Sequence, residues 1–490
     1  MVRTPDRRSV LTSIPQEHSS RWNAEGGYRQ ILVIAFPLIL STGSWSLQHF
    51  VDRVFLAWYS PEAIAASTPA GILNYTLMSL FIGTAGYVST FVAQYHGAGR
   101  PERIGPSVWQ GIYISGIGAI AMALFIPIAG PAFRLIGHAP EIQRQETVYF
   151  SILCLGAFPA IACSALAGFF SGRGETWPVM WANLLATVVN IVLDYLLIFG
   201  VWSFPELGIA GAAIATNLSM VAALVAYCAL IAREAHDRRF RIVRGWRLDP
   251  ELFSRIIRFG LPNGIQFFLD MAGFTAFLLI IGRLGTAALA ATNIALNINT
   301  LAFMPMIGLG MAVSILVGQH LGQNDAPLAV RCVGTGFHLT LLYMGTIALL
   351  YVATPGLFLA PFGLYSQPGA YDEIRRLAEV LLRFVALYSL FDALTIVFAS
   401  AIKGAGDSRF VMYMVSGLSV GVLIVPSYVA IEIFGAGILV GWTIATAYVS
   451  ALGVAFYLRF KSGKWQTMRV IEHPSRHPVP STPERSSPEA

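Results

Sequence analysis

Acidic side chains stand inside long apolar segments of this 490-residue chain. Asp52 lies in the apolar run 29–58, and helical spacings back from it reach a set of polar or amphipathic side chains. That set comprises Gln48, Trp45, Ser44 and Ser41. The run 177–200 repeats the pattern on one helical face, with Asn183, Thr187, Asn190 and Asp194. Because a bilayer tolerates carboxylates mainly where they serve a function, we interpret both faces as a hydrated path or an ion site.

Two chemical uses fit these carboxylates, and both stay open. A carboxyl group that loses hydration on burial binds a proton more readily, so Asp52 or Asp194 could carry H⁺. Alternatively, carboxylate, amide and hydroxyl oxygens form a hard-oxygen site in which Na⁺ would fit. The ligands that three spans of the first half offer for it are Asp52, Asn190, Asp194 and Thr216. We expect Na⁺ or H⁺ as the coupling ion and no other cofactor.

The second half carries its own polar positions at helical spacings. They fall in the runs 254–282, 287–318 and 374–402, and they are Asn263, Gln266 and Asp270; Asn293, Asn297 and Thr300; Tyr388, Asp392 and Thr395. From these we predict a site for a cationic substrate or a second cation, made by Asp270, Asp392, Gln266 and Asn297. Pro37 and Pro262 each interrupt the backbone hydrogen bonding of a helix, which predicts a kink in both.

The composition places these residues in a membrane. The chain is 56% hydrophobic and only 12% charged, with a mean hydropathy of +0.64, whereas soluble domains are about 25% charged. Twelve apolar runs approach or exceed the length of about 20 residues that crosses a bilayer. They lie near 29–58, 68–95, 108–133, 146–171, 177–200, 209–232, 254–282, 287–318, 329–354, 374–402, 410–431 and 436–458. We predict an all-α membrane protein with twelve transmembrane helices.

The chain matches its own second half at an offset of 225 residues, so it is a duplicated unit. The residues that coincide include Pro37, Ala65, Ala66, Gln94 and Gly97 with Pro262, Ala290, Ala291, Gln319 and Gly322. Six spans in each half make the halves enter the membrane from the same side, which predicts two six-helix bundles as parallel repeats. The expected parts are a tail 1–28, an N-lobe 29–232, a basic linker 233–253, a C-lobe 254–459, and a tail 460–490 whose Pro- and Ser-rich end from His473 predicts disorder.

The distribution of basic residues predicts the orientation. With both chain ends placed in the cytoplasm, seven of the 32 Lys and Arg residues fall on the outer side. These seven are Arg53, Arg134, Arg144, Arg283, Arg375, Arg376 and Arg383. The net charge of +6 therefore reports membrane topology and gives no support to nucleic-acid binding. The four cysteines show no metal-binding or disulfide spacing.

The chain resembles the multidrug and toxic compound extrusion (MATE) family over nearly its whole length. The segments that carry the resemblance are Phe50-Val51-Asp52-Arg53-Val54-Phe55, Asn190-Ile191-Val192-Leu193-Asp194-Tyr195, Gly211 to Thr216, and Gly318-Gln319-His320-Leu321-Gly322. Asp270, and Asp392 placed 15 residues before Asp407, are similar to the NorM-type branch. The resemblance implies a V-shaped monomer in a bacterial inner membrane. It would expel cationic or amphipathic organic compounds in exchange for inward Na⁺ or H⁺, and it would not be an enzyme.

Two other functions compete with this one. Flippases for lipid-linked saccharides share the general architecture, but they would be expected to line their cavity with basic residues, and the intramembrane charges here are mainly acidic. An intramembrane aspartyl protease would use Tyr371-Asp372 and Gly404-Ala405-Gly406-Asp407. Asp372 belongs to an outer loop and Asp407 to an inner one, so a hydrocarbon core about 30 Å thick separates two groups that would have to touch.

Overall fold

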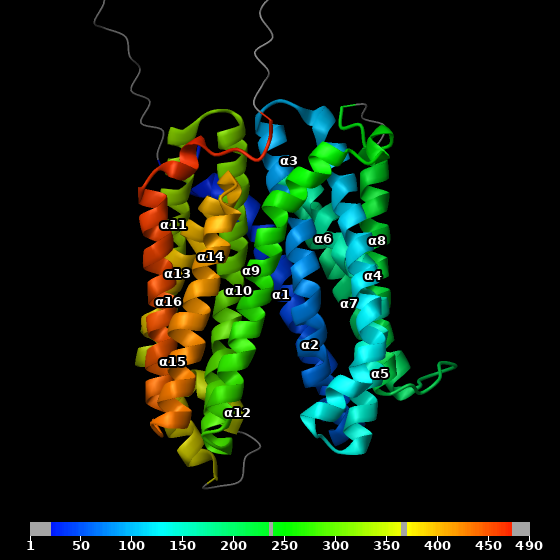
Figure 1. Cartoon of the computed structure of the whole chain (residues 1–490), viewed down its shortest axis with the longest axis vertical. Coiled ribbons are helices and arrows are strands. Elements are labelled where there is room, and N and C mark those ends of the chain that lie inside the picture. Colours follow the sequence, from blue (N-terminus) through cyan, green and yellow to red (C-terminus); the bar gives the residue numbers. More distant parts are fainter. Residues whose placement is uncertain (1–20, 235–238, 364–369, 473–490) are drawn as a thin grey trace, which may run out of the picture.

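Helices make up most of the computed structural model, which describes residues 21–234, 239–363 and 370–472 (Figure 1). Eleven helical stretches in these ranges are long and apolar enough to cross a membrane, and the pair α5 and α6, bent by 45°, makes a twelfth. Each stretch coincides with one of the twelve apolar runs. The predicted all-α membrane fold is therefore confirmed.

The first half contains eight α-helices. They are α1 (Tyr28–Tyr59), α2 (Pro61–Gly86), α3 (Val88–Gly97), α4 (Ile104–Ile136), α5 (Pro140–Leu155), α6 (Ala157–Gly172), α7 (Trp177–Phe199) and α8 (Ile209–Glu234), with the 3₁₀ turn η1 (Pro101–Arg103) before α4. Helix α1 continues through Pro37, which is buried. Two short 3₁₀ or irregular joints thus separate segments that together cross the membrane six times.

The second half follows the 3₁₀ turn η2 (Arg244–Trp246). Its elements are α9 (Pro250–Gly282), α10 (Thr286–Gly322), α11 (Ala326–Ala353), α12 (Pro355–Gly363), α13 (Ala370–Ala405), α14 (Ser408–Leu418), η3 (Ser419–Ile424), α15 (Val425–Tyr428), η4 (Val429–Ile433), α16 (Ile438–Lys461) and η5 (Lys464–Thr467). Elements η3 and η4 are π-helical turns inside one span. Helix α9 continues through the buried Pro262, and a kink at either proline stays a prediction.

The two halves form two groups of helices that touch at one end and diverge at the other (Figure 1). The first and last described residues lie at the end where the groups touch, which we name the closed end; the opposite end is the open end. We use N-lobe for the group containing α2 to α8 and C-lobe for the group containing α9 to α16. Helix α1 packs against both, since it contacts α7 and α10.

The closed end is held by a contact that occurs twice. In α3, the Gln94 side chain donates to the Gly404 carbonyl of the C-lobe at 3.0 Å. In α10, the Gln319 side chain donates to the Gly172 carbonyl of the N-lobe at 2.9 Å. Gln94 and Gln319 are equivalent by the 225-residue offset. The duplicated sequence therefore makes the same bond in each direction between the lobes.

Two equivalent glycines permit this approach. A Cβ atom at Gly97 would lie 1.9 Å from the Gln319 carbonyl oxygen, and one at Gly322 would lie 2.3 Å from the Gln94 carbonyl oxygen. Only a residue without a side chain lets α3 and α10 cross so closely. The repeated Gln-x-x-Gly sequence thus supplies both the bond and the space for it.

A second reciprocal contact lies deeper in the molecule. Gly83 of α2 packs against Gly264 of α9, where a Cβ would be 2.8 Å from the opposite Cα. Its offset mate Gly308 of α10 packs against Ile39 of α1, where a Cβ would be 2.9 Å from the backbone nitrogen. Ile39 and Gly264 are also 225 residues apart. The lobe boundary is thus two-fold symmetric over at least two layers.

The segments outside the spans are more ordered than the sequence indicated. The linker packs on α4, where Gly105 N donates to the Phe240 carbonyl at 3.1 Å and Trp109 Nε1 donates to the Ile242 carbonyl at 2.8 Å. In the tail 460–490, Trp465 is fully buried and stacks on Phe460 at 5.0 Å between ring centroids. This part of the tail therefore belongs to the fold, while the stretch from His473 onward lies outside the described residues.

Candidate functional site

The polar faces of α1 and α7 meet inside the N-lobe. Asn183 Nδ2 donates to Ser41 Oγ, and Thr187 Oγ1 donates to the Ser44 carbonyl at 3.4 Å. On α1 the buried polar residues are Ser41, Ser44, Gln48 and Asp52. Trp45 is 36% exposed and lies off this face, so its inclusion in the stripe was wrong. The reason is geometric, because Trp45 directly follows Ser44 and adjacent helical residues point about 100° apart.

Asp52, Asn190 and Asp194 form one buried cluster from α1 and α7. With its amide nitrogen turned to the carboxylates, Asn190 donates to Asp52 Oδ1 at 2.8 Å and to Asp194 Oδ2 at 3.2 Å. The two carboxyl groups lie within hydrogen-bonding reach of each other. Asp194 is fully buried and Asp52 is 8% exposed. Thr216 of α8 borders the cluster, with its Oγ1 3.5 Å from the Asn190 amide.

This arrangement demands a cation. Two carboxylates at contact in a low-dielectric interior cannot both stay ionised without a positive partner between them. Within the described ranges, no Lys or Arg forms an ion pair with either aspartate, and Asp194 Oδ1 has no hydrogen-bond partner. The cluster therefore has a free acceptor where a proton or a small cation can bind.

The C-lobe cluster includes a residue that the sequence patterns did not single out. Gln266 Nε2 donates to Asp270 Oδ2, and Lys403 Nζ of α13 donates to Gln266 Oε1 at 3.3 Å. Lys403 is one of three lysines in the chain, which was the available signal. Its place two residues before the end of α13 gave it the look of an ordinary charge at a membrane boundary. In the fold it provides the positive charge nearest to Asp270.

Asp392 lies in a separate pocket of the C-lobe. It is 8% exposed, and its carboxylate has no hydrogen bond to any residue that the structure describes. Tyr388, one turn earlier on α13, stacks on Trp442 with ring centroids 6.4 Å apart. Tyr448 of α16 lies near enough to interact electrostatically with both Asp270 and Asp392. The two acids therefore share a neighbour without touching.

Asn297 does not join this cluster. Its side chain is exposed, and its amide donates to the Asn293 carbonyl of its own helix at 2.8 Å. Thr300 behaves in the same way toward Leu296. The polar side of α10 that points into the C-lobe contains Thr292 instead, which accepts from Trp442 Nε1 at 3.2 Å. The stripe chosen on α10 was offset from its buried face by one residue.

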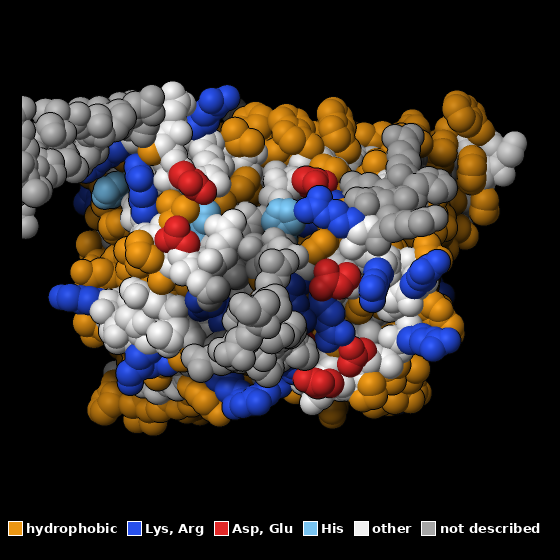
Figure 2. Space-filling view, turned by 90° about the horizontal axis from the view of Figure 1, so that it is seen from above, with side chains coloured by type: hydrophobic (Ala, Val, Ile, Leu, Met, Phe, Trp, Pro, Cys, Tyr) orange, Lys and Arg blue, Asp and Glu red, His pale blue; other side chains and the backbone are white. Residues whose placement is uncertain are grey.

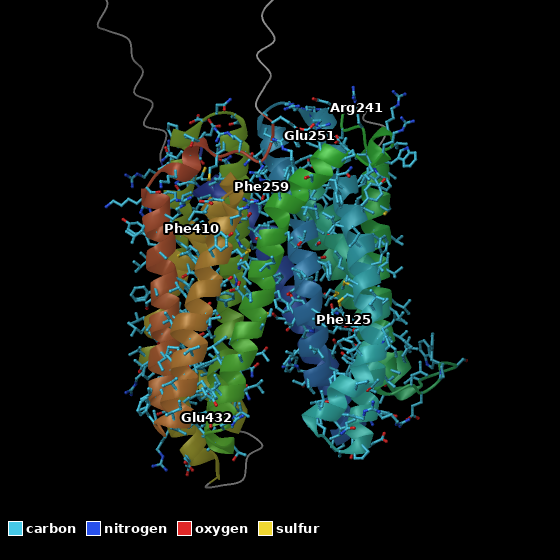
Figure 3. The ribbon with its side chains drawn as sticks, viewed as in Figure 1. Phe125, Arg241, Glu251, Phe259, Phe410 and Glu432 are labelled. Atoms are coloured by element: carbon cyan, nitrogen blue, oxygen red, sulfur yellow. The ribbon has the colours of Figure 1, made fainter. Side chains whose placement is uncertain are left out.

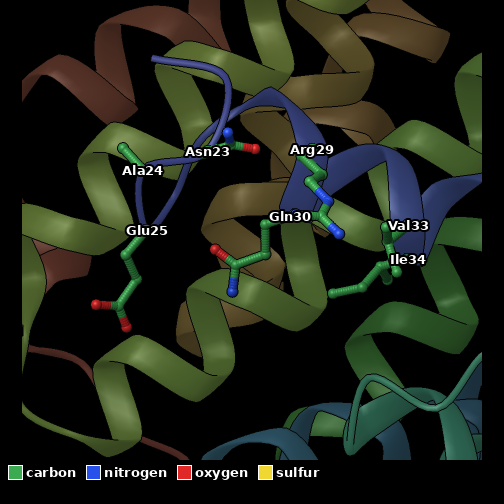
Figure 4. A pocket seen from close by; sticks show the side chains of 7 residues that line it. All are labelled: Asn23, Ala24, Glu25, Arg29, Gln30, Val33 and Ile34. Carbon is green, nitrogen blue, oxygen red and sulfur yellow. The ribbon is translucent and has the colours of Figure 1, made fainter. Parts of the chain in front are cut away.

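Two pockets lie away from the acids. The larger, about 880 Å³, opens between α1, α7 and α10 and is mostly apolar; its lining includes Leu47, Phe50, Trp177, Trp181, Leu301 and Met304. The smaller, about 390 Å³, lies at the start of α1 (Figure 4). There Gln30 Oε1 accepts from Gly26 N at 2.7 Å. The larger pocket includes Ser44, so it borders the polar face of α1.

The protease-like sequence is a helix end. Asp407 accepts from Arg459 Nε at 2.8 Å and from Arg459 Nη2 at 2.6 Å. Asp372 lies at the other end of α13, and a helix of that length spans about 50 Å at 1.5 Å per residue. Charged groups at the two ends of the molecule, such as Glu251 and Glu432, show this separation in Figure 3. The two aspartates therefore cannot act on one substrate.

Known proteins resemble this chain over most of its length. The family model MatE matches residues 37–196 and 262–429. The probable multidrug resistance protein NorM of Bradyrhizobium diazoefficiens is 28% identical over 407 residues, which cover 82% of this chain and 85% of that one. The protein of the same name from Thermotoga maritima is 24% identical, covering 90% and 94%.

Solved structures agree with the fold. One described as the outward-facing conformation of a multidrug resistance MATE family transporter of the MOP superfamily has a TM-score of 0.81 at 17% identity, covering 91% of this chain and 98% of that one. A MOP superfamily transporter from Pyrococcus furiosus, whose binding pocket is described as having reverse polarity, has a TM-score of 0.80 at 18% identity, covering 91% and 98%.

Proposed function

The chain belongs to the MatE family, and from this premise we propose that it exports small organic compounds, cationic or amphipathic, in exchange for inward Na⁺ or H⁺. It is a multi-pass membrane protein. We place it in the plasma membrane of a bacterium, as a monomer with both termini in the cytoplasm. The observation that carries the proposal is the buried pair Asp52 and Asp194, bridged by Asn190.

The paired carboxylates support the ion half of the exchange. A proton or a Na⁺ that neutralises them would enter from the side to which the cluster is open and leave when the lobes reopen toward the other side. One charge moving down a potential of 100 mV releases about 2.3 kcal/mol. That is enough to sustain a concentration ratio of tens-fold in an exported compound, so the ion gradient alone can drive the transport.

The coupling ion is tested by efflux from proteoliposomes that contain ethidium. A pure Na⁺ gradient and a pure pH gradient are imposed in separate samples. We expect one of them to accelerate efflux over a sample without a gradient. Equal rates in all three samples would contradict ion-coupled export.

The C-lobe supports the substrate half. Asp270 should attract a permanent cation, and Lys403 competes with that cation for the carboxylate through Gln266. We expect Asp270→Asn to weaken the apparent affinity for a cationic substrate by about 10- to 100-fold, which corresponds to 1–3 kcal/mol. The affinity for an uncharged substrate should change less. Paired dose–response curves in the same vesicles measure both.

The matched variant is Lys403→Met, which removes the competing charge and keeps the length of the side chain. It should strengthen the apparent affinity for the cation, opposite in sign to Asp270→Asn. Equal losses for charged and uncharged substrates in Asp270→Asn would assign Asp270 to coupling or structure and remove it from substrate binding.

The proposed orientation rests on the charges at the closed end. Figure 2 looks onto that end and shows Lys, Arg, Asp and Glu side chains gathered inside a hydrophobic rim. A cytoplasmic face enriched in basic residues agrees with the rule for membrane insertion. The closed end would then face the cytoplasm and the open end the outside.

This orientation predicts the labelling of single cysteines by a membrane-impermeant thiol reagent. Arg244→Cys, in the linker, should react only after the membrane is permeabilised. Trp202→Cys, in the 88% exposed position between α7 and α8, should react in intact cells. Labelling of Arg244→Cys in intact cells would overturn the assignment.

A further inference from the structure

The chain returns across the closed end after its last span. Residues 468–472, which we name the C-terminal segment, run from η5 toward the N-lobe. Val470 N donates to Gln94 Oε1 at 2.8 Å, while Gln94 Nε2 donates to the Gly404 carbonyl of the C-lobe. One amide side chain of the N-lobe is thus bonded to both the C-lobe and the C-terminal segment. The equivalent Gln319 has no such partner among the described residues.

The carboxylate of Glu472 binds three guanidinium groups. Two belong to the N-lobe side, Arg100 at 3.2 Å and Arg103 at 3.1 Å, and the third is Arg255 of α9 in the C-lobe, at 2.9 Å. Tyr95 also donates its hydroxyl to Glu472 at 3.0 Å. A carboxylate is the complementary ligand for such a group of donors. We name these four residues the arginine site.

The segment is packed as well as charged. Val470 is fully buried and Ile471 is 7% exposed. Gly406, at the end of α13, has a φ of +111°, and a Cβ there would lie 2.8 Å from Val470 Cγ1. A glycine at this turn therefore satisfies the backbone and leaves room for the valine. The contact surface includes residues from both lobes.

We propose that the arginine site is a carboxylate-binding site whose ligand is the chain's own Glu472, and that the C-terminal segment acts as a latch on the closed end. Separation of the lobes there requires Glu472 to leave either the N-lobe arginines or Arg255. When it leaves, the cationic groups of the two lobes lose the anion between them and repel each other. Release of the segment therefore favours the opening that the proposed transport cycle requires.

The latch should stay closed throughout the physiological pH range. Partial burial acts to raise the pKa of Glu472, but the backbone hydrogen bond and the contacts with Tyr95 and Arg103 outweigh it, and the net pKa lies below the ordinary value of 4.5. A carboxyl with a lowered pKa stabilises the folded contact at pH values above its ordinary pKa. That stabilisation is lost only as the pH falls through the lowered value. The groups facing it are the four of the arginine site.

The test measures the distance between the lobes at the closed end. Nitroxide labels are attached to cysteines at Arg244, in the linker on the N-lobe, and at Pro327, at the start of α11, in the full chain with its four native cysteines replaced. Pulsed electron spin resonance in lipid nanodiscs then gives the distribution of distances. We expect Glu472→Gln to raise the ratio of separated to closed molecules by about tenfold, since it weakens a charged contact to each lobe. Glu472→Lys should raise it further.

The matched control is Glu251→Gln. Glu251 also approaches Arg255, at 3.9 Å, but it is exposed and lies outside the C-terminal segment, so the distribution should remain that of the unchanged chain. Distributions of Glu472→Gln and Glu472→Lys that equal the unchanged one would overturn the latch. No transport is measured, so this result is independent of whether the protein exports an organic cation.

Discussion

Asp52→Asn and Asp194→Asn should each abolish ion-driven efflux. The amide has nearly the shape of the carboxylate but carries neither a charge nor an exchangeable acid proton, so the cluster around Asn190 would no longer bind and release a cation. We expect the gradient-dependent rate to fall by at least about tenfold, because a missing charge at a desolvated site costs more than 1.4 kcal/mol. The rate is measured with reconstituted protein under the gradient that drives the unchanged chain.

The control for this pair is Asp372→Asn, which removes an acid that is exposed at the open end. It should leave the rate unchanged. Thermal unfolding in detergent shows whether each variant is folded. Transport by either site variant at the rate of the unchanged chain would remove that aspartate from the coupling site.

Gly97→Ala should disrupt the closed end. The added methyl group would lie 1.9 Å from the Gln319 carbonyl oxygen, which is backbone and cannot rotate away. Helices α3 and α10 must therefore separate, and such overpacking costs about 1–3 kcal/mol in typical cores. We expect a lower melting temperature, together with a longer distance between Arg244 and Pro327 in the spin-label measurement.

Gly116→Ala supplies the comparison. Gly116 lies within α4 and has no atom within 4 Å of an added Cβ. Alanine there should raise the stability by about 0.5–1 kcal/mol, because it restricts the unfolded chain and fits the helix. If both alanines shifted the melting temperature in the same direction, the close crossing at Gly97 would not be the cause.

Periodicity and hydropathy sufficed for the spans because each crossing must bury about 20 apolar residues, whatever its neighbours are. The duplication was readable for the same reason, since Gln94 and Gln319 fall at the same register. The bend between α5 and α6 was not readable. Gly156 separates them, but a glycine in an apolar helix does not by itself indicate an angle.

The site was predictable only where partners lie on one helix or on helices that must face each other. Asp52 and Asp194 were found because each ends a polar face, and a polar face in lipid must turn inward. Lys403 was missed because its backbone is at the helix end while its long side chain reaches back into the lobe. Glu472 was missed because its partners, such as Arg255, are hundreds of residues away in sequence and are joined only by the fold.

The twofold contacts at the lobe boundary have the form of an isologous interface, the kind that two identical subunits make in a C₂ dimer. Gln94 does to one half what Gln319 does to the other. Such an interface favours neither partner, so by itself it gives the two lobes equivalent roles when they part. The C-terminal segment touches only one copy of the repeated glutamine. It is therefore an element by which a duplicated and formally symmetric protein distinguishes its first half from its second.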